Sequence, residues 1–238
     1  MKFLLTAIAT ITMAVSAWSQ VGDIRMVTEY RVKVDRATEF VDLQTQYAAE
    51  LKKAGATRTR YVFQLMSGPR AYIASIYFQK FADLDTPFPQ TAATAALLAR
   101  INSCVESSER RIDLIDPSLS IRETSAVPNM VQVVRVSVRP EKVDEYLALA
   151  KSTSYPAYKK AGVKRRTFAR VRFGGPNSDF VSSIGLEKWA DLDAPNPLQK
   201  SLGEKGYQDF MAKLSTLIYR SQFDVYRYMP DASYIPSR

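Results

Sequence analysis

The sequence Lys52-Lys53-Ala54-Gly55, followed by Gly68-Pro69 and by Phe81-Ala82-Asp83-Leu84-Asp85, occurs a second time further along the chain. The second occurrence reads Lys159-Lys160-Ala161-Gly162, then Gly175-Pro176, then Trp189-Ala190-Asp191-Leu192-Asp193. Corresponding positions are offset by 107, 107 and 108 residues, so the internal spacing is kept to within one residue. Three landmarks in the same register indicate a tandem duplication, and the chain is therefore read as two copies of one unit.

The N-terminus has the pattern of a secretory signal peptide, residues 1–19. Lys2 supplies a positive charge, residues 3–15 form an almost uncharged apolar run, and small residues precede Gln20. This run is shorter than the ~20 residues that a membrane-spanning helix needs. We therefore expect export to the periplasm or the exterior, with no membrane association of the mature chain. The alternative is a buried N-terminal helix.

The composition excludes several kinds of site. The 238 residues include no histidine and a single cysteine, Cys104. The lack of histidine excludes His-ligated haem, His-based zinc or iron sites, and Ser-His or Cys-His nucleophiles. A carboxylate-only metal site stays open but has no supporting motif, so we expect neither a cofactor nor a metal. One cysteine cannot form an internal disulfide, and the apolar neighbours of Cys104 predict a small buried residue.

The charge of the chain bears on its partners. The formal net charge is +9, which favours anionic ligands or anionic surfaces through the overall field. Because the expected export and the lack of a recognisable binding module argue against nucleic acid, we expect a small-molecule ligand as the partner.

Hydrophobic periodicity places the elements of the first copy. Alternation over 26–34 predicts a strand, and a helical stripe from Ala37 to Leu51 predicts a helix that ends at Gly55. The elements expected after it are strands over 57–66 and 72–81, a helix over 91–111 and a strand over 111–115. The order is βαββαβ, and the copy occupies residues 26–117.

The same order recurs in residues 130–229, between a linker over 118–129 and a C-terminal tail over 230–238. Pro156 lies inside the first helix of this copy and is expected to kink or split it. The expected elements are strands over 130–138, 164–173, 180–189 and 223–228, and helices over 143–158 and 202–221.

A βαββαβ unit with a central hairpin has the ferredoxin-like order. The aromatic-x-Asp-Leu-Asp end of the third strand, at Phe81–Asp85 and Trp189–Asp193, resembles the dimeric α/β-barrel superfamily. This superfamily includes the antibiotic-biosynthesis monooxygenases, the stress-responsive α/β-barrel proteins and the NIPSNAP-like proteins. The resemblance covers residues 26–228. It implies an α+β fold in which two ferredoxin-like repeats form, within one chain, a pseudo-dimeric antiparallel barrel of eight strands with the helices outside.

The resemblance does not supply a catalytic centre. Haem enzymes of the superfamily use a proximal histidine, which this sequence lacks. No catalytic motif of its cofactor-free monooxygenases can be matched to residues here, so catalytic residues stay unknown.

Polar residues on the strand faces opposite the apolar ones are expected to point into the barrel. Because the first and last strands of the ferredoxin-like order are neighbours, we expect Arg31 to pair with Asp113, and Arg135 with Asp224. Such pairs are either structural ion pairs or arginines that present a forked donor to an anionic ligand. The full set of candidate ligand-binding residues is Arg31, Asp113, Arg135, Asp224, Tyr77, Ser183, Glu187 and Tyr226.

Two further groups have competing interpretations. Lys164, Arg166, Arg170 and Arg172 surround Phe168 in the second copy alone, and form either a ligand site or a solvated edge face. The pairs Asp83/Asp85 and Asp191/Asp193 suit turn capping better than acid–base or metal chemistry, because each follows a strand and precedes proline.

The sequence thus predicts an exported α/β-barrel protein that binds a small anionic or aromatic ligand inside the barrel. The alternatives are a cofactor-independent monooxygenase of the same superfamily, and a structural or interaction protein whose barrel is filled by side chains. An open, polar-lined pocket would favour the first two and a closed barrel the third. The oligomeric state is left open.

Overall fold

The computed structural model describes residues 23–124 and 126–236, so the expected signal peptide lies outside the described residues. The strands of the first half are β1 Ile24–Val32, β2 Arg60–Leu65, β3 Ala71–Phe78 and β4 Val105–Ile115, and its helices are α1 Ala37–Lys53 and α2 Ala92–Ser103. A short strand, β5 Ile121–Arg122, follows. The strands of the second half are β6 Met130–Val138, β7 Arg165–Phe173, β8 Asp179–Leu186 and β9 Ile218–Tyr228. Its helices are α3 Val143–Leu149, the π-helical segment η5 Ala150–Ser154, α4 Tyr155–Lys160 and α5 Pro197–Leu217. Short 3-10 segments are η2 Val34–Arg36, η3 Phe81–Asp85, η4 Pro140–Lys142 and η6 Trp189–Leu192.

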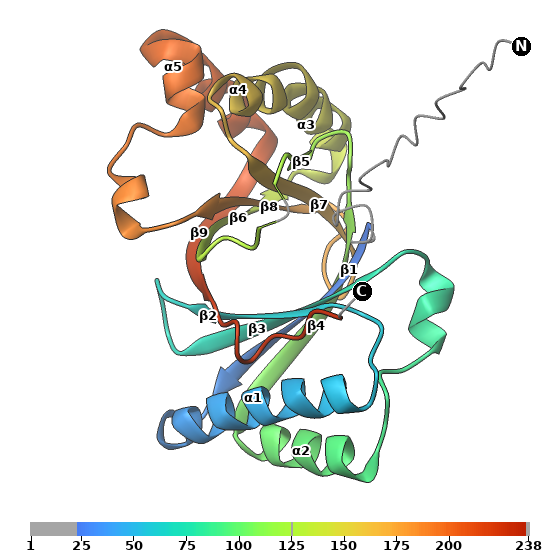
Figure 1. Ribbon diagram of the computed structural model, residues 1–238. Coiled ribbons are helices and arrows are strands. Elements are labelled where there is room, and N and C mark those ends of the chain that lie inside the picture. The colour runs from blue at the N-terminus through green and yellow to red at the C-terminus, as the bar shows by residue number, and fades with distance from the viewer. Residues whose placement is uncertain (1–22, 125, 237–238) are drawn as a thin grey trace, which may run out of the picture.

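The sheet closes on itself. The strand order is β4-β1-β3-β2-β9-β6-β8-β7, and β7 pairs back to β4. The pairings between successive strands are antiparallel. Helices α1 and α2 lie outside one side of this barrel, and α3, α4 and α5 lie outside the opposite side (Figure 1). The expected α+β fold, an antiparallel eight-stranded barrel with outer helices, is confirmed.

The repeated Lys-Lys-Ala-Gly sequence ends a helix in each half. Helices α1 and α4 stop just before Gly55 and Gly162, whose φ angles are +67° and +79°. Glycine adopts this left-handed conformation without a steric penalty, which is why it suits the position after a helix. The first aspartate of each repeated pair caps a turn as expected. Asp83 accepts the backbone N–H groups of Gln79 and Lys80, and Asp191 accepts those of Glu187 and Lys188.

The second helix of each half ends earlier than the sequence predicts. The helix expected over 91–111 ends at Ser103, and the helix expected over 202–221 runs from Pro197 to Leu217. The strands that follow have 11 residues each. Their first halves are polar and exposed, so helix propensity and strand pairing compete there. Pairing of β4 with β1, and of β9 with β6, decides the outcome.

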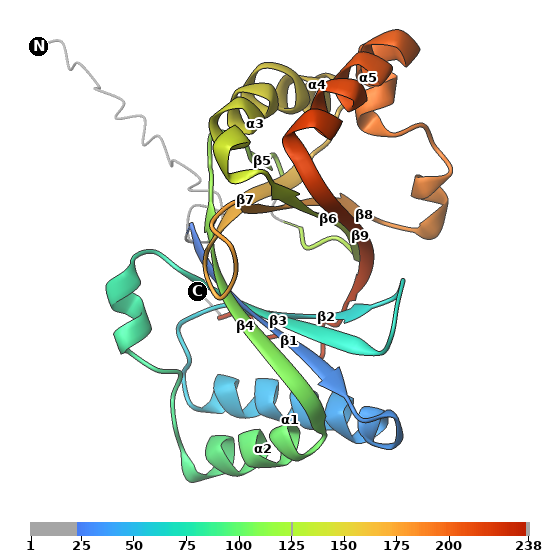
Figure 2. The same ribbon diagram turned by 180° about the vertical axis from the view of Figure 1, so that it is seen from behind.

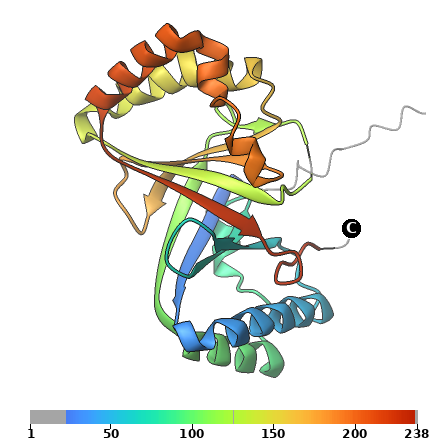
Figure 3. The ribbon, with the colours of Figure 1, turned by 90° about the vertical axis from the view of Figure 1, so that its left-hand side faces the viewer.

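The segment after the last strand of each half crosses to the other half. After β4, residue Ile121 pairs with Arg166, and after β9, residue Tyr234 pairs with Arg60. Figures 2 and 3 show the course of the chain after these two strands. Each of these arginines also donates a side-chain hydrogen bond to the crossing segment. Arg166 donates to the carbonyl of Leu119, and Arg60 to that of Ala232. The two halves are therefore fastened to each other by both crossing segments.

Side chains occupy the barrel interior. A buried cluster joins residues from β1, β2, β3, β6, β7, β8 and β9: Val27, Tyr61, Phe63, Ile73, Val133, Val171, Val181 and Tyr226. Ion-paired side chains also occupy the interior. In the described part of the chain, the helices lack the length and apolarity needed to cross a membrane.

Candidate functional site

The structure corrects the expected partner of Arg31. Strands β1 and β4 are antiparallel neighbours, so the end of one lies beside the start of the other. Arg31 is opposite Ser107 and exposed, whereas Asp113 is opposite Arg25. The expected Arg31–Asp113 pair is therefore wrong, although the strands were correctly placed side by side.

Asp113 has two arginine partners, buried Arg25 and partly buried Arg111. Its side chain is wholly buried and accepts hydrogen bonds from Nη2 and Nε of Arg25, at 2.8 and 3.2 Å. Its other oxygen accepts from Nε of Arg111 at 3.1 Å. Burial lowers the pKa of Arg25, but the charges and hydrogen bonds of Asp113 and Tyr77 together outweigh this effect, and the pKa is raised. The group is a closed ion-pair cluster whose carboxylate is already engaged.

Arg135 does not pair directly with Asp224. Its Nη2 donates to Oε2 of Glu29 at 3.1 Å and to the hydroxyl of Tyr226 at 2.6 Å. Asp224 is opposite Val133 in the ladder and accepts a hydrogen bond from Nε2 of Gln222 at 2.9 Å. The expected Arg135–Asp224 pair is replaced by a contact across the barrel, which strand adjacency cannot predict.

The remaining candidates divide between the barrel interior and the surface. Tyr77 packs edge-on against Tyr61, with ring centroids 5.7 Å apart, at the interior cluster. Ser183 is opposite Val133 of that cluster. Glu187 follows the end of β8 and is exposed, and it accepts a hydrogen bond from Asn129. Glu187 is therefore not a residue of the barrel interior.

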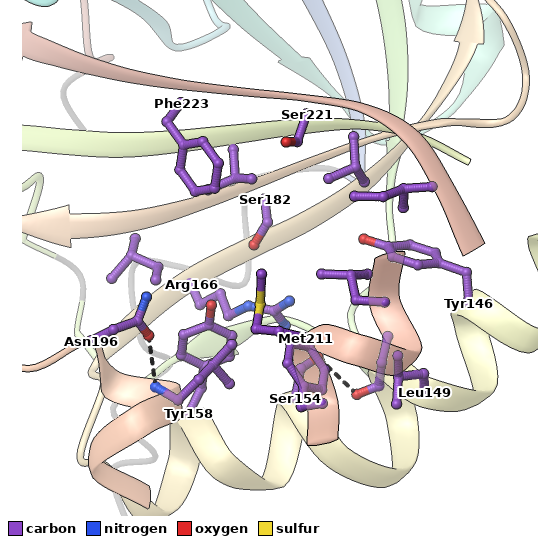
Figure 4. Close-up of a pocket in the computed structure, with 18 of the residues that line it drawn as sticks. Tyr146, Leu149, Ser154, Tyr158, Arg166, Ser182, Asn196, Met211, Ser221 and Phe223 are labelled. Atoms are coloured by element: carbon purple, nitrogen blue, oxygen red, sulfur yellow. Dashed lines mark hydrogen bonds between the residues drawn. The ribbon is translucent and has the colours of Figure 1, made fainter. Parts of the chain in front are cut away.

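A pocket lies outside the barrel, between its wall and the helices of the second half. Its volume is about 170 Å³. The outward-facing residues of β6, β7, β8 and β9 form its floor, while α3, η5, α4 and α5 cover it (Figure 4). Most of the lining is aliphatic or aromatic, as in ordinary small-molecule sites. None of the eight candidate residues from the sequence lines it.

Arg166 is the charged group of this pocket. Its residue is 3% exposed, and its guanidinium lies over the rings of Tyr158 and Phe168, at 4.6 and 5.1 Å from their centroids. Nη1 donates to the carbonyl of Leu119 at 2.5 Å, but the buried Nε has no hydrogen-bond partner among the described residues. Burial lowers the pKa of Arg166, because the charged form loses its hydration.

A second polar group in the pocket also lacks a partner. The hydroxyl oxygen of Ser182, on β8, is buried and makes no hydrogen bond to any described residue. Figure 4 shows this hydroxyl pointing into the space between strands and helices. Buried polar groups without partners are uncommon in native proteins and call for a physical explanation. Two of the four such atoms in the described residues lie in this one apolar pocket.

Backbone irregularities gather around the same pocket. Residues 150–154 form a π-helical turn just ahead of Pro156, whose lack of an N–H disturbs the helical ladder. Ala150 and Ser154 of this turn line the pocket. Helix α5 on its other side contains Gly203 with φ +72°, where the helix kinks. Helix α1 of the first half, which corresponds to the stretch formed by α3, η5 and α4, is regular over 17 residues. Single π turns occur frequently at functional sites.

Exposed apolar side chains border the pocket. Met211 of α5 and Phe223 of β9 line it and are 41% and 60% exposed. They lie on either side of the space that Ser182 faces (Figure 4). An apolar ligand can therefore enter between α5 and β9.

The sequence contained one signal for this site. Arg166 belongs to the basic cluster of the second copy. The interpretation of this cluster as a solvated face is wrong for Arg166, which is buried, but it holds for Lys164 and Arg172, which are exposed. A buried arginine is also present at the corresponding position of the first half, Arg60, so a buried arginine is not peculiar to the second copy. No pattern in the sequence distinguishes Ser154, Ser182 or Asn196 as residues of a site.

No family model matches the sequence, and no curated protein matches it. Solved structures do share the fold. A protein from Fusobacterium nucleatum described as a putative monooxygenase is 13% identical, with 86% of this chain and 91% of that chain covered and a TM-score of 0.64. A second putative monooxygenase, from Lactobacillus acidophilus, is 10% identical, with coverages of 90% and 96% and a TM-score of 0.62. A haem-binding protein from Thermus thermophilus is 13% identical, with coverages of 88% and 92% and a TM-score of 0.50. The chain is an α/β-barrel protein of the general kind that these structures represent.

The pocket does not suit haem. The chain has no histidine, and Cys104 is not among the residues that line the pocket. A tyrosine ligand would have to lose its proton, yet burial raises the pKa of Tyr146 and Tyr158, two of the three tyrosines in the lining. The volume of about 170 Å³ is also below the roughly 300 Å³ at which cofactor pockets begin.

Proposed function

We propose that this protein binds a small molecule in the pocket between β6–β9 and the helices α3–α5. The observation that carries the proposal is Arg166, a buried cation in an apolar cavity that has no carboxylate partner, and no partner for its Nε, among the described residues. An uncompensated buried charge is costly, and a ligand with an anionic or acceptor group offsets that cost.

Size and polarity narrow the ligand. An engineered apolar cavity of about 150 Å³ accepts benzene, so a pocket of about 170 Å³ suits a molecule of about one ring. Arg166 and Ser182 would meet its polar end, while Leu149 and Phe210 contact the apolar part. The expected small anionic or aromatic ligand is retained, and its proposed place moves from the barrel interior to this pocket.

Native mass spectrometry of the protein isolated from its own host tests the proposal, with denaturation to release any bound molecule. We expect a stoichiometric ligand that is lost in Arg166→Gln and retained in Arg172→Gln. Arg172 lies on the same strand and is exposed, so its variant matches the change in charge. A ligand retained equally by folded Arg166→Gln protein would overturn the proposed site. Circular dichroism establishes that the variants are folded.

A cofactor-independent oxygenase is the second candidate, because two structures of the same fold are described as putative monooxygenases. The described lining holds hydrogen-bond donors but no carboxylate and no histidine, so it offers no ordinary general base. Oxygen uptake that depends on the released ligand would support this candidate over simple binding.

Two further proposals concern the chain as a whole. The halves are copies that arose by duplication, and the second has acquired the irregular helices around its pocket. The chain is exported after cleavage behind Ser19, which N-terminal sequencing of the mature protein tests by the presence of Gln20 at its start.

A further inference from the structure

The first half contains a second pocket in the corresponding place. It lies between the outward face of β1–β4 and the helices of that half, and its volume is about 320 Å³. Arg60 of β2, opposite Ile76 of β3, is part of its lining. In the second half, Arg166 of β7 is opposite Ile184 of β8 in the same relation. Both pockets therefore contain a buried arginine at the same position in the ladder.

Three arginines from different parts of the first half converge on this pocket. Arg58 precedes β2, Arg60 is in β2, and Arg110 is in β4. The described lining includes no aspartate or glutamate, and none of the three arginines forms an ion pair with a described residue. The pocket therefore concentrates positive charge that no described carboxylate balances.

The hydrogen bonds of these arginines hold them in place without neutralising them. Arg60 is 4% exposed and donates to Oε1 of Gln44 at 2.5 Å and to the carbonyl of Ala232 at 3.2 Å. Arg58 donates to the carbonyl of Thr86, and Nε of Arg110 lies 3.4 Å from the hydroxyl of Thr28. All of these acceptors are neutral, so the guanidinium charges remain available to an anion.

Aromatic rings form the walls beside the charges. The guanidinium carbon of Arg58 lies 5.1 Å from the ring centroid of Phe78 and 5.8 Å from that of Phe88. Arg60 lies 5.3 Å from the centroid of Tyr47. Guanidinium groups fixed against aromatic faces are pre-organised for a planar oxyanion, and the rings offer contact to a flat apolar body.

We propose that this first-half pocket is a second ligand site, and that it binds an organic anion with a carboxylate or similar oxyanion head and a flat apolar body. The head meets Arg58, Arg60 and Arg110, and the body contacts Phe78 and Phe88. The site is distinct from the second-half pocket, which has one arginine and a smaller volume.

Fluorine NMR titration of the full chain with 4-fluorobenzoate tests the proposal. We expect saturable binding that Arg58→Gln and Arg110→Gln each weaken about tenfold, the usual effect of losing a hydrogen bond to a charged group. Both arginines are at least partly exposed, so these variants keep the fold. Exposed Arg31→Gln is the control for the loss of one charge, and Arg166→Gln reports any binding in the second-half pocket.

A neutral probe and an inorganic probe distinguish the contribution of the anionic head to binding from that of the apolar body. We expect 4-fluorobenzyl alcohol to bind at least tenfold more weakly than 4-fluorobenzoate, and inorganic phosphate to compete without sensitivity to Phe88→Ala. Equal binding of the alcohol would overturn the assignment of an anion. In a different outcome, Arg166→Gln abolishes the binding of 4-fluorobenzoate, while Arg58→Gln and Arg110→Gln leave it unchanged. This result would overturn the proposed location in the first half without affecting the proposal for the second half.

Discussion

Arg135 of β6 and Glu29 of β1 meet inside the barrel, with 3.1 Å between Nη2 and Oε2. Their strands are not neighbours. In the closed order, β3, β2 and β9 separate them in one direction, and β4, β7 and β8 in the other. The ion pair therefore connects the two halves of the chain across the barrel, and Tyr226 extends it to β9.

Arg135→Leu should destabilise the protein by about 3 kcal/mol, because it leaves Glu29 largely buried without its partner. The double variant Arg135→Leu/Glu29→Leu should recover most of this loss, since neither charge then remains. Urea denaturation measures both. The exposed pair Lys164–Glu123 is the control, and Lys164→Ala should change stability by less than about 0.5 kcal/mol. A double variant as unstable as the single one would contradict this account.

Asp113→Asn should also destabilise the fold, by about 3 kcal/mol, because Arg25 then remains buried without a counter-charge, and partly buried Arg111 loses the same partner. Arg31→Gln should have an effect within about 0.5 kcal/mol, as expected of an exposed residue away from any buried pair. Thermal unfolding of the two variants gives the comparison. Equal losses would contradict the account in which Asp113 balances a buried charge and Arg31 does not.

Strand order could be predicted from the sequence, but register could not. The repeated Lys-Lys-Ala-Gly and aromatic-x-Asp-Leu-Asp sequences mark a helix end and a turn in each half, and they placed the hairpins correctly. The choice between Arg25 and Arg31 as the partner of Asp113 depends on where β1 begins relative to β4. Both arginines have the same parity on β1, so alternation does not distinguish them.

The pocket of the second half could not be predicted from the sequence for a different reason. Its floor consists of outward-facing strand residues, which alternation assigns to the helix-packing core rather than to a site. Ser182 and Arg166 differ from ordinary core residues in that one buried polar atom of each, Oγ and Nε, has no hydrogen-bond partner among the described residues. That property depends on three-dimensional packing, which alternation along a strand does not report.

The stability of the protein should fall in alkali. Burial raises the pKa of Tyr61 and of Tyr226 to about 12 each, whereas an unfolded tyrosine has a pKa of about 10. Between these values the folded protein keeps protons that the unfolded chain has lost. The stabilisation is thus complete below about pH 10 and decreases up to about pH 12, by about 1.4 kcal/mol per pH unit for each tyrosine. Urea titrations at pH 9.5, 10.5 and 11.5 measure the slope. Tyr226→Phe should make it shallower, and an unchanged slope would contradict the assignment.

Ser182→Ala should separate stability from binding. The hydroxyl of Ser182 is buried without a partner in the described structure, so its removal should stabilise the ligand-free protein by about 1 kcal/mol. The same change should weaken binding in the second-half pocket about fivefold, because a ligand loses one neutral hydrogen bond. Ser183→Ala is the matched control, since Ser183 is the next residue on β8 and faces the barrel interior instead. Urea denaturation of the ligand-free protein and calorimetric titration with the released ligand measure the two effects. A Ser182→Ala variant that is less stable and binds as tightly as the parent would show that the hydroxyl has a structural partner rather than a ligand.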